Sequence, residues 1–238
     1  GRLVETEDLI GALRQALGAR GDLAGRRIVV SAGGTHEPID PVRFIGNRSS
    51  GKMGFAIAEA ARDRGAAVTL VCGPVALAAP YGVVRVDVAT TAQMAEAVVR
   101  AVKGCDAVIM AAAPADFRAA NAADQKIKRT GAALSIELAP NADILAAISG
   151  DFVKVGFAAE TQDLLENARA KIAKKGLDLI AANDVTARDA GFAADTNRVT
   201  LIDASGATEA LPLLSKYDVS QRILDRVARL IDARRAGV

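Results

Sequence analysis

Two loops in the first quarter of the chain contain residues suited to holding a phosphate group. Gly33 and Gly34 follow an apolar run, and Ser49, Ser50 and Gly51 directly precede a segment with helical periodicity. Glycines let backbone N–H groups approach a ligand closely, and the N-terminus of a helix attracts an anion. We therefore expect Gly33 and Gly34 to approach a ligand and residues 49–51 to bind a phosphate. A simple helix N-cap explains the same serines equally well.

Neither loop matches a standard nucleotide motif. Residues 46–53 have the spacing of a P-loop, but Met53 stands where that motif needs a Ser or Thr hydroxyl for Mg²⁺. The G-x-G-x-x-G fingerprint of dinucleotide-binding domains is absent, and the second predicted strand ends in Cys72 and Gly73 where a ribose-binding acid is expected. These absences exclude a P-loop NTPase and argue against an NAD(P)-dependent reductase, which stays as an alternative.

Charged side chains at the ends of predicted elements are further candidates. Asp116 follows an apolar strand at the edge where open α/β sheets bind ligands, and an acid there can bind a base amine, a ribose or Mg²⁺. Lys171 and Lys175 are four residues apart and share one helix face, although cations near a helix C-terminus also suit the macrodipole. Lys126 lies in a basic stretch, a pattern usually found on a solvated face.

Short apolar segments alternate with helical ones along most of the chain. This alternation is typical of a parallel, doubly wound sheet, and a core poor in aromatic residues, which make up 3% of the chain, suits it. We therefore predict a Rossmann-like α/β fold with a mostly parallel sheet and a long loop over 32–50. Predicted strands cover 27–31, 67–72, 83–88, 106–111, 153–157 and 178–182, and predicted helices cover 51–64, 92–102, 161–175 and 218–235.

Two segments break the parallel pattern and predict an added antiparallel part. Residues 133–138 alternate apolar and polar side chains, as an exposed strand does. Residues 198–203 and 207–213 flank the turn Ala204-Ser205-Gly206, which predicts a β-hairpin. Between these two segments, Asn141 has the position of a helix N-cap.

Length and composition predict one domain. The 238 residues suit a single domain over 23–238, and we interpret 1–22 as a linker from a preceding domain, with an amphipathic helix over 8–17. A formal net charge of +2 does not suggest a nucleic-acid-binding protein. No run of about 18 apolar residues predicts a membrane span, and no signal peptide is visible, so we expect a cytoplasmic protein that binds neither membranes nor nucleic acid.

Cysteine and histidine content limits the chemistry further. Cys72 and Cys105 adjoin apolar runs, so we expect two reduced thiols packed in the core. His36 is the single histidine, which excludes sites that need two, including common zinc sites.

Several blocks of residues form a recognisable series spanning about 26–197. They are 31–35 (SAGGT), Glu37, 39–43 (IDPVR), Ile45, Asn47, 49–54 (SSGKMG), 115–118 (ADFR), 126–128 (KIK), 156–161 (GFAAET) and 183–185 (NDV). In this order they closely resemble phosphopantothenate–cysteine ligase of the CTP-using bacterial type. That type is normally the C-terminal half of a protein whose N-terminal half is a flavin-dependent decarboxylase, so the resemblance implies no flavin in this domain.

The resemblance implies a ligation in two steps that belongs to coenzyme A biosynthesis. CTP activates the carboxylate of 4′-phosphopantothenate as an acyl-cytidylate and releases pyrophosphate. The amine of L-cysteine then attacks the acyl carbon, giving 4′-phosphopantothenoyl-cysteine and CMP. A non-catalytic regulatory relative is a second alternative, and the presence of both Asn47 and Lys126 argues against it.

Individual roles follow from the resemblance. Asn47 matches the catalytic asparagine, whose amide can donate to an oxyanion, although Asn also suits a turn. Lys126 matches a catalytic lysine on a flap over CTP, and Arg129 and Ala142 replace a lysine and a proline of the family. The resemblance places Asp116 in the CTP site and leaves the metal ligands unknown; Asp116 is a candidate through Mg²⁺ bound to CTP. The implied CTP-binding residues are Gly33, Gly34, Asp116, Lys126, Ala142, Asp143, Ile144, Leu145, Phe157, Lys171 and Lys175, and the expected substrate-phosphate residues are Ser49, Ser50 and Gly51.

The resemblance further implies a homodimer whose active site is completed by the second chain. Exposed strand edges are ready-made pairing surfaces. The predicted strand over 133–138 and the predicted hairpin over 198–213 are therefore the expected pairing edges.

Overall fold

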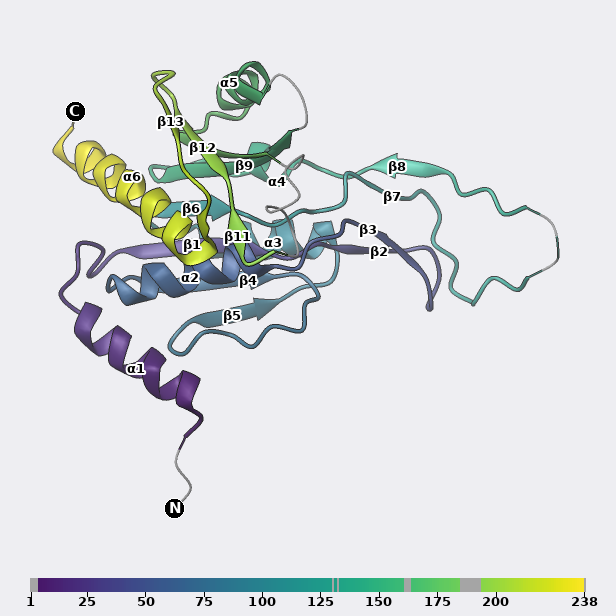
Figure 1. Cartoon of the computed structure of the whole chain (residues 1–238). Helices are drawn as coiled ribbons and strands as arrows, with labels where there is room; N and C mark the ends of the chain where they lie inside the picture. The colour runs from purple at the N-terminus through teal and green to yellow at the C-terminus, as the bar shows by residue number, and fades with distance from the viewer. Residues whose placement is uncertain (1–3, 130, 132, 161–163, 185–193, 238) are drawn as a thin grey trace.

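The computed structural model describes residues 4–129, 131, 133–160, 164–184 and 194–237. An eight-stranded sheet forms the centre of the molecule, in the order β13-β12-β10-β9-β6-β1-β4-β5 (Figure 1). The six strands from β10 to β5 are parallel, and β12 and β13 are antiparallel. The strands are β1 (Arg27–Ala32), β4 (Ala67–Cys72), β5 (Val84–Asp87), β6 (Ala107–Met110), β9 (Val153–Glu160), β10 (Leu179–Asp184), β12 (Val199–Asp203) and β13 (Thr208–Ala210).

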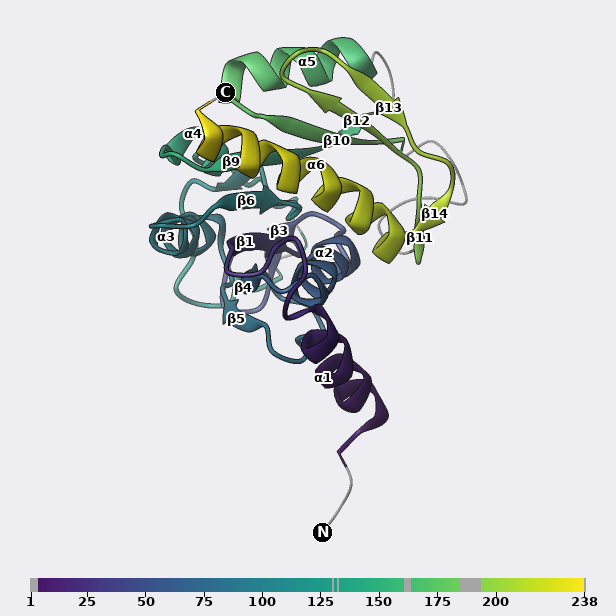
Figure 2. The same cartoon turned by 90° about the vertical axis from the view of Figure 1, so that its left-hand side faces the viewer.

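Helices cover both faces of this sheet, which confirms the predicted Rossmann-like α/β fold (Figure 2). The helices α2 and α6 share one face, and α3, α4 and α5 lie on the other. The predicted helix over 161–175 begins at Leu164 in the described part of the chain, because residues 161–163 lie outside it. The helices are α1 (Thr6–Gly18), α2 (Lys52–Asp63), α3 (Thr91–Ala101), α4 (Ile144–Ala147), α5 (Leu164–Lys175) and α6 (Lys216–Ala236).

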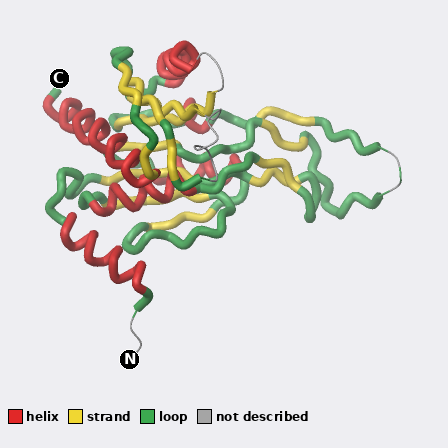
Figure 3. Tube along the Cα trace, viewed as in Figure 1, coloured by secondary structure: helices red, strands yellow, loops and turns green. Residues whose placement is uncertain are grey.

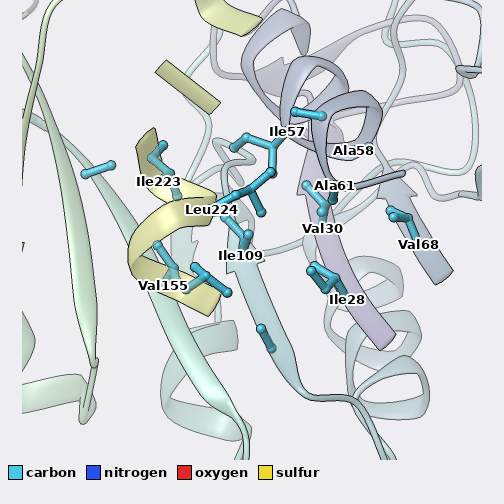
Figure 4. Packing of buried hydrophobic residues seen from close by; sticks show 14 of the residues in the cluster. Ile28, Val30, Ile57, Ala58, Ala61, Val68, Ile109, Val155, Ile223 and Leu224 are labelled. Carbon is cyan, nitrogen blue, oxygen red and sulfur yellow. The ribbon is translucent and has the colours of Figure 1, made fainter. Parts of the chain in front are cut away.

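The core follows from the alternation of side chains along the strands. Ile28 and Val30 of β1 belong to the hydrophobic cluster under α2 and α6, whereas Val29 between them belongs to the cluster under α3. Figure 4 shows the first cluster, where Ile57 of α2 and Leu224 of α6 meet above β1. Because β1 is apolar on both faces, it lies in the middle of the sheet, as buried parallel strands do.

An arm of two short hairpins extends from one end of the sheet (Figure 3). It consists of β2 (His36–Pro38) paired with β3 (Phe44–Gly46) and β7 (Phe117–Ala119) paired with β8 (Leu138–Pro140). The prediction of a loop over 32–50 is therefore wrong for the β2–β3 hairpin, whose strands are too short to give a periodic signal. The predicted strand over 133–138 is also wrong except for its last residue, because β7 pairs only with residues 138–140.

The predicted hairpin at the other edge is confirmed. Strands β12 and β13 flank the turn at 204–206, and β12 pairs with β10 on the sheet. Two further short strands, β11 (Thr196–Asn197) and β14 (Leu214–Ser215), pair beside it. The helix α1 packs against α2, with Arg14 forming an ion pair with Glu59 at 3.3 Å. Among the described helices, none has the length and apolar character needed to cross a bilayer.

Candidate active site

The candidate site lies at the point in the sheet where the order of the strands reverses. Strands β4 and β6 lie on opposite sides of β1, so the loops that follow β1 and β6 separate at their carboxyl ends. Open α/β sheets bind ligands in such a crevice. The two loops remain joined at their start, because the Ala113 N–H donates to the Gly33 carbonyl at 2.8 Å and the Ala112 N–H donates to the Ser31 hydroxyl at 3.1 Å.

Two adjoining cavities occupy this crevice. The first, here called the α2 cavity, has a volume of about 280 Å³ and begins at the N-terminus of α2. The second, the α4 cavity, has a volume of about 270 Å³ and lies against α4. Asp116 and Phe157 line both of them, so the two cavities are parts of one larger site.

Most of the CTP-binding residues implied by the sequence line the α4 cavity. Asp116, Phe157, Lys175 and the segment 142–145 surround it. Asp143 caps α4, because its carboxylate accepts from the N–H groups of Leu145 and Ala146. It also forms an ion pair with Lys175 at 2.8 Å. Burial alone would raise the pKa of Asp143, but the hydrogen bond and charge of Lys175 hold that pKa below its ordinary value.

Lys171 is one turn away from Lys175 on α5. It is half-buried, and it lines neither of the two cavities as the described residues define them. The structure thus brings Lys175 to the implied nucleotide site and leaves Lys171 beside it.

The predicted phosphate-binding residues line the α2 cavity. Ser49, Ser50 and Gly51 form the turn into α2, with Gly51 in the left-handed region at a φ of 77°. A side chain at Gly51 would be strained in this conformation. The Ser49 and Ser50 hydroxyls lie 3.4 and 3.5 Å from the N–H groups of Gly51 and Lys52, so the turn directs polar groups at the start of the helix.

Four polar residues of the α2 cavity were not predicted from the sequence, and one of them is Lys52 at the start of α2. Asn183 and Asn197 are hydrogen bonded to each other at 3.2 Å, and Lys216 begins α6. Asn183 belongs to one of the blocks named above, but no role followed from it. Lys216 gives no signal in the sequence, because a lysine at the start of an amphipathic helix usually faces solvent.

A buried hydrogen-bond chain fixes the floor of the site. The Ala115 N–H donates to the Thr35 hydroxyl at 2.9 Å, this hydroxyl lies 2.9 Å from the Thr91 hydroxyl, and the Thr91 hydroxyl donates to Glu37 at 2.8 Å. Thr35, Thr91 and Glu37 are all at least 97% buried. Because a carboxylate only accepts, each hydroxyl donates toward Glu37.

Asn141 joins this chain from the opposite side and is not a helix N-cap. Its amide donates to the Ala115 carbonyl at 2.9 Å, and Asp143 caps α4 instead. The N-cap prediction for Asn141 is therefore wrong, because a buried carbonyl in the neighbouring loop binds its side chain. Ala115 is thus held on both its N–H and its carbonyl, immediately before Asp116.

Gly33, Gly34 and Asn47 lie at the junction of the loops and do not line the two cavities formed by the described residues. A Cβ on Gly34 would lie 2.7 Å from the Asn47 carbonyl oxygen, so this contact requires glycine. The Asn47 side chain donates to the Pro114 carbonyl at 3.0 Å. Asn47 is therefore fixed against the loop that carries Asp116.

Lys126 is exposed on the arm and lines neither cavity of the described part. The backbone beside it is held firmly, because the Ile127 N–H donates to Asp40 at 3.1 Å and Arg43 donates to the Ile127 carbonyl at 2.9 Å. Arg43 also pairs with Asp40, and this contact holds the pKa of Asp40 well below its usual range. Within one chain, Lys126 is separate from the other candidate residues.

The described residues offer few ligands for a metal ion. In the residues that the structure describes, no group of three or more His, Cys, Asp or Glu side chains converges on one point. Asp116 remains a single carboxylate at the boundary of the two cavities. Mg²⁺ commonly binds through one or two carboxylates together with substrate phosphates, so this arrangement fits an ion that arrives with a nucleotide.

These features define an α/β domain of the doubly wound class with a two-part site at its topological switch point. The model of the family "DNA/pantothenate metabolism flavoprotein C-terminal domain" matches residues 23–231, and the chain belongs to this family.

Similar proteins are known in sequence and in structure. The chain is 45% identical over 236 residues to the coenzyme A biosynthesis bifunctional protein CoaBC of Bacillus subtilis (strain 168), covering 97% of this chain and 58% of that protein. It is 42% identical over 240 residues, again 97% of this chain, to a cysteine/cysteine sulfinic acid decarboxylase from an unknown prokaryotic organism, of which it covers 67%. The crystal structure of a CoaBC C-terminal domain matches with a TM-score of 0.76 at 39% identity, covering 89% of this chain and 98% of that chain.

Proposed function

We propose that this domain is a CTP-dependent phosphopantothenate–cysteine ligase, which joins 4′-phosphopantothenate to L-cysteine through an acyl-cytidylate. The observation that carries the proposal is the α4 cavity, where Asp116, residues 142–145, Phe157 and Lys175 meet from four separate segments. The names of the CoaBC relatives support coenzyme A biosynthesis. Since the chain spans 58% of the length of the first of them, we propose that its full-length form also carries an N-terminal flavin-dependent decarboxylase.

The main candidate residues have defined tasks in this proposal. Asp116 and the loop 142–145 bind and orient the nucleotide, and Lys175 contributes positive charge beside it. Lys126 neutralises charge at the α-phosphate when the substrate carboxylate attacks it and pyrophosphate leaves. Asn47 donates a hydrogen bond to the oxyanion that forms when the cysteine amine attacks the acyl carbon, and CMP leaves with the bonding electron pair.

Mg²⁺ bound to the nucleotide phosphates would partly neutralise their charge and polarise the phosphorus that is attacked. Asp116 would hold the ion from the protein side. Its carboxylate lies where the two cavities meet. This position would be the junction between a nucleoside in one cavity and a phosphate in the other.

We propose that the active form is a homodimer in which the arm completes the site. The arm exposes the large apolar side chains Val42, Phe44, Phe117, Leu134 and Leu138, with exposed fractions between 46% and 60%. Apolar patches of this kind commonly mark protein interfaces. A second chain would bury them and bring its exposed Lys126 to a site that a single chain leaves open. Sedimentation analysis should give a dimer, and Phe117→Asp should give a monomer with lower activity.

An assay of pyrophosphate release tests the proposed reaction. With 4′-phosphopantothenate and Mg²⁺, CTP should support release, and ATP should support far less. CTP should also raise the melting temperature, because a ligand that binds only the folded state stabilises it. Asp116→Ala and Lys175→Ala should reduce this shift, whereas Lys174→Ala, at an exposed position next to Lys175, should not.

The same preparation separates the alternatives. Release of CO₂ from L-cysteine without CTP would instead favour a cysteine decarboxylase, the activity for which the second relative is named. Binding of a nicotinamide cofactor without binding of CTP would favour a reductase. The arrangement of the first loop argues against the reductase, because β1 leads into the β2–β3 hairpin before α2 and not directly into a helix.

Two variants test the division of roles between the catalytic residues. Lys126→Ala should lower pyrophosphate release itself by about 10²–10³-fold, the usual cost of losing an electrostatic stabiliser. Asn47→Ala should still release pyrophosphate and should accumulate acyl-cytidylate in the presence of cysteine, which mass analysis of quenched samples detects. If Asn47→Ala gives neither intermediate nor pyrophosphate, Asn47 acts in activation or in folding, and the assigned role is wrong.

A further inference from the structure

A lysine at the start of α6 is buried in the wall of the α2 cavity. Lys216 is only 6% exposed, and its ammonium group contacts the Ala194 carbonyl and lies 3.4 Å from the Thr196 carbonyl. Lysine is almost never fully buried in proteins unless it is paired, because desolvation of its charge costs free energy. Such a position therefore requires a reason, and its two carbonyl contacts orient the side chain along the wall of the cavity.

A second lysine lies beside it. Lys52 lines the same cavity and forms an ion pair with Asp195 at 2.6 Å. Burial has the largest effect on the pKa of Lys216 and lowers it below its ordinary value, and the nearby charge of Lys52 lowers it further. The charge of Asp195 raises this pKa. Asp195 is 88% exposed, so water strongly screens its charge. The two ammonium groups thus repel each other within one small cavity.

The remaining groups at this end of the cavity also favour an anion. The Ser49 and Ser50 hydroxyls accept from the N–H groups of Gly51 and Lys52 at 3.4 and 3.5 Å, which places them at the start of α2, where the helix dipole is positive. Lys52 and Lys216 also line the neighbouring groove on the α1 side, whereas Asp116 also lines the α4 cavity. The two lysines therefore lie where the α2 cavity adjoins this groove, and the carboxylate lies where it adjoins the α4 cavity.

We propose that Lys216, together with Lys52, binds a phosphate group of a reactant in the α2 cavity, between the two ammonium groups and the turn 49–51. This inference extends the proposed function, which assigns no role to either lysine. A phosphate dianion would relieve the repulsion between the lysines and would form charge-assisted hydrogen bonds to both of them. The group has two chemical sources, the phosphate monoester of the acid substrate and the phosphates of the nucleotide.

Calorimetric titration of the whole chain with 4′-phosphopantothenate, with CTP and with inorganic pyrophosphate distinguishes these sources. Lys216→Met should weaken binding of at least one of the three about ten- to a hundredfold, as expected for losing a hydrogen bond to a charged group. A loss confined to 4′-phosphopantothenate assigns the monoester, and a loss for CTP and pyrophosphate assigns the nucleotide. Lys216→Arg should keep most of the affinity, and Lys174→Met, at an exposed lysine on α5, should leave all three unchanged.

Lys52→Met provides the second test, because Lys52 is 35% exposed and its loss should be tolerated by the fold. Lys52→Met should weaken binding of the same ligand as Lys216→Met. If Lys216→Met does not fold, the result for Lys52→Met alone decides whether the cavity binds a phosphate. Unchanged affinity for all three ligands in the folded variants would overturn the inference and leave Lys216 a structural residue. The titrations need no turnover, so the inference stands or falls separately from the ligase activity.

Discussion

Replacing Thr91 by valine should destabilise the domain through the buried chain beneath the site. Valine has nearly the shape of threonine, so the change removes the hydroxyl and leaves the packing in place. The Thr35 hydroxyl then loses its acceptor at 2.9 Å, and Glu37 loses the donor at 2.8 Å while it keeps the Thr91 N–H at 2.8 Å. All three side chains lie in the interior, where water cannot replace the lost partner.

The cost follows mainly from these two short hydrogen bonds, because the other contacts of the Thr91 hydroxyl, with the Ala115 carbonyl and the Asn141 amide, are long at 3.4 Å. A neutral buried hydrogen bond contributes about 0.5–1.5 kcal/mol and one to a charged group about 1.5–3 kcal/mol, so Thr91→Val should lower the free energy of unfolding by about 2–4 kcal/mol. For a domain of this size, each kcal/mol corresponds to about 2–4 °C in the melting temperature. A decrease of about 4–16 °C is therefore expected.

Urea unfolding followed by circular dichroism measures the free energy, and an unchanged m-value shows that the unfolded state is the same. Thr208→Val, on the exposed face of the edge strand β13, is the matched control and should stay within about 0.5 kcal/mol of the wild type. Hydrogen exchange should also accelerate at the Ala115 amide, which donates into the chain. If Thr91→Val is as stable as Thr208→Val, the buried hydrogen-bond chain does not stabilise the floor of the site and this reasoning is refuted.

Two further predictions concern titratable groups. Burial raises the pKa of Cys72 and Cys105 to about 11, so a thiol reagent at pH 8 should label both much more slowly in the folded protein than in urea; fast labelling of the native protein would contradict their burial. Lys175→Met removes the partner of Asp143, whose folded pKa is lowered from 3.8. The pair therefore stabilises the fold at pH values above the unfolded-state pKa of Asp143, and this stabilisation is lost as the pH falls through the folded pKa of Asp143. Unfolding free energies should differ by at most about 1 kcal/mol at pH 6, because the pair is partly exposed, and should converge once the pH falls well below the folded pKa of Asp143; a pH-independent difference would exclude the ion pair as its cause.

The sheet could be predicted from the sequence because its strands are buried on both faces. Runs such as Ile28-Val29-Val30 serve two hydrophobic clusters at once, and only a central parallel strand needs apolar residues at successive positions. The arm lacks this constraint. Its strands are three residues long and its apolar side chains, such as Phe44 and Leu134, are exposed, so alternation over 133–138 suggested a strand that the structure does not form.

The site shows the same limit in a different form. Asp116 was predictable because it lies in the loop that follows the buried strand β6, and its neighbours in the α4 cavity follow from matching blocks of sequence. Lys216 was not, because its role depends on where α6 begins. The α2 and α6 helices pack against each other on one face of the sheet, and this contact places the first residue of α6 beside the first residue of α2. The two lysines are 164 positions apart in the chain, and no local pattern can record that they meet. A cation at the start of a helix opposes the helix dipole, so the position is locally unfavourable for both lysines. A functional role is expected at positions where residues go against local preference in this way. The unfavourable positions of Lys52 and Lys216 therefore support their proposed role in binding a phosphate of a reactant.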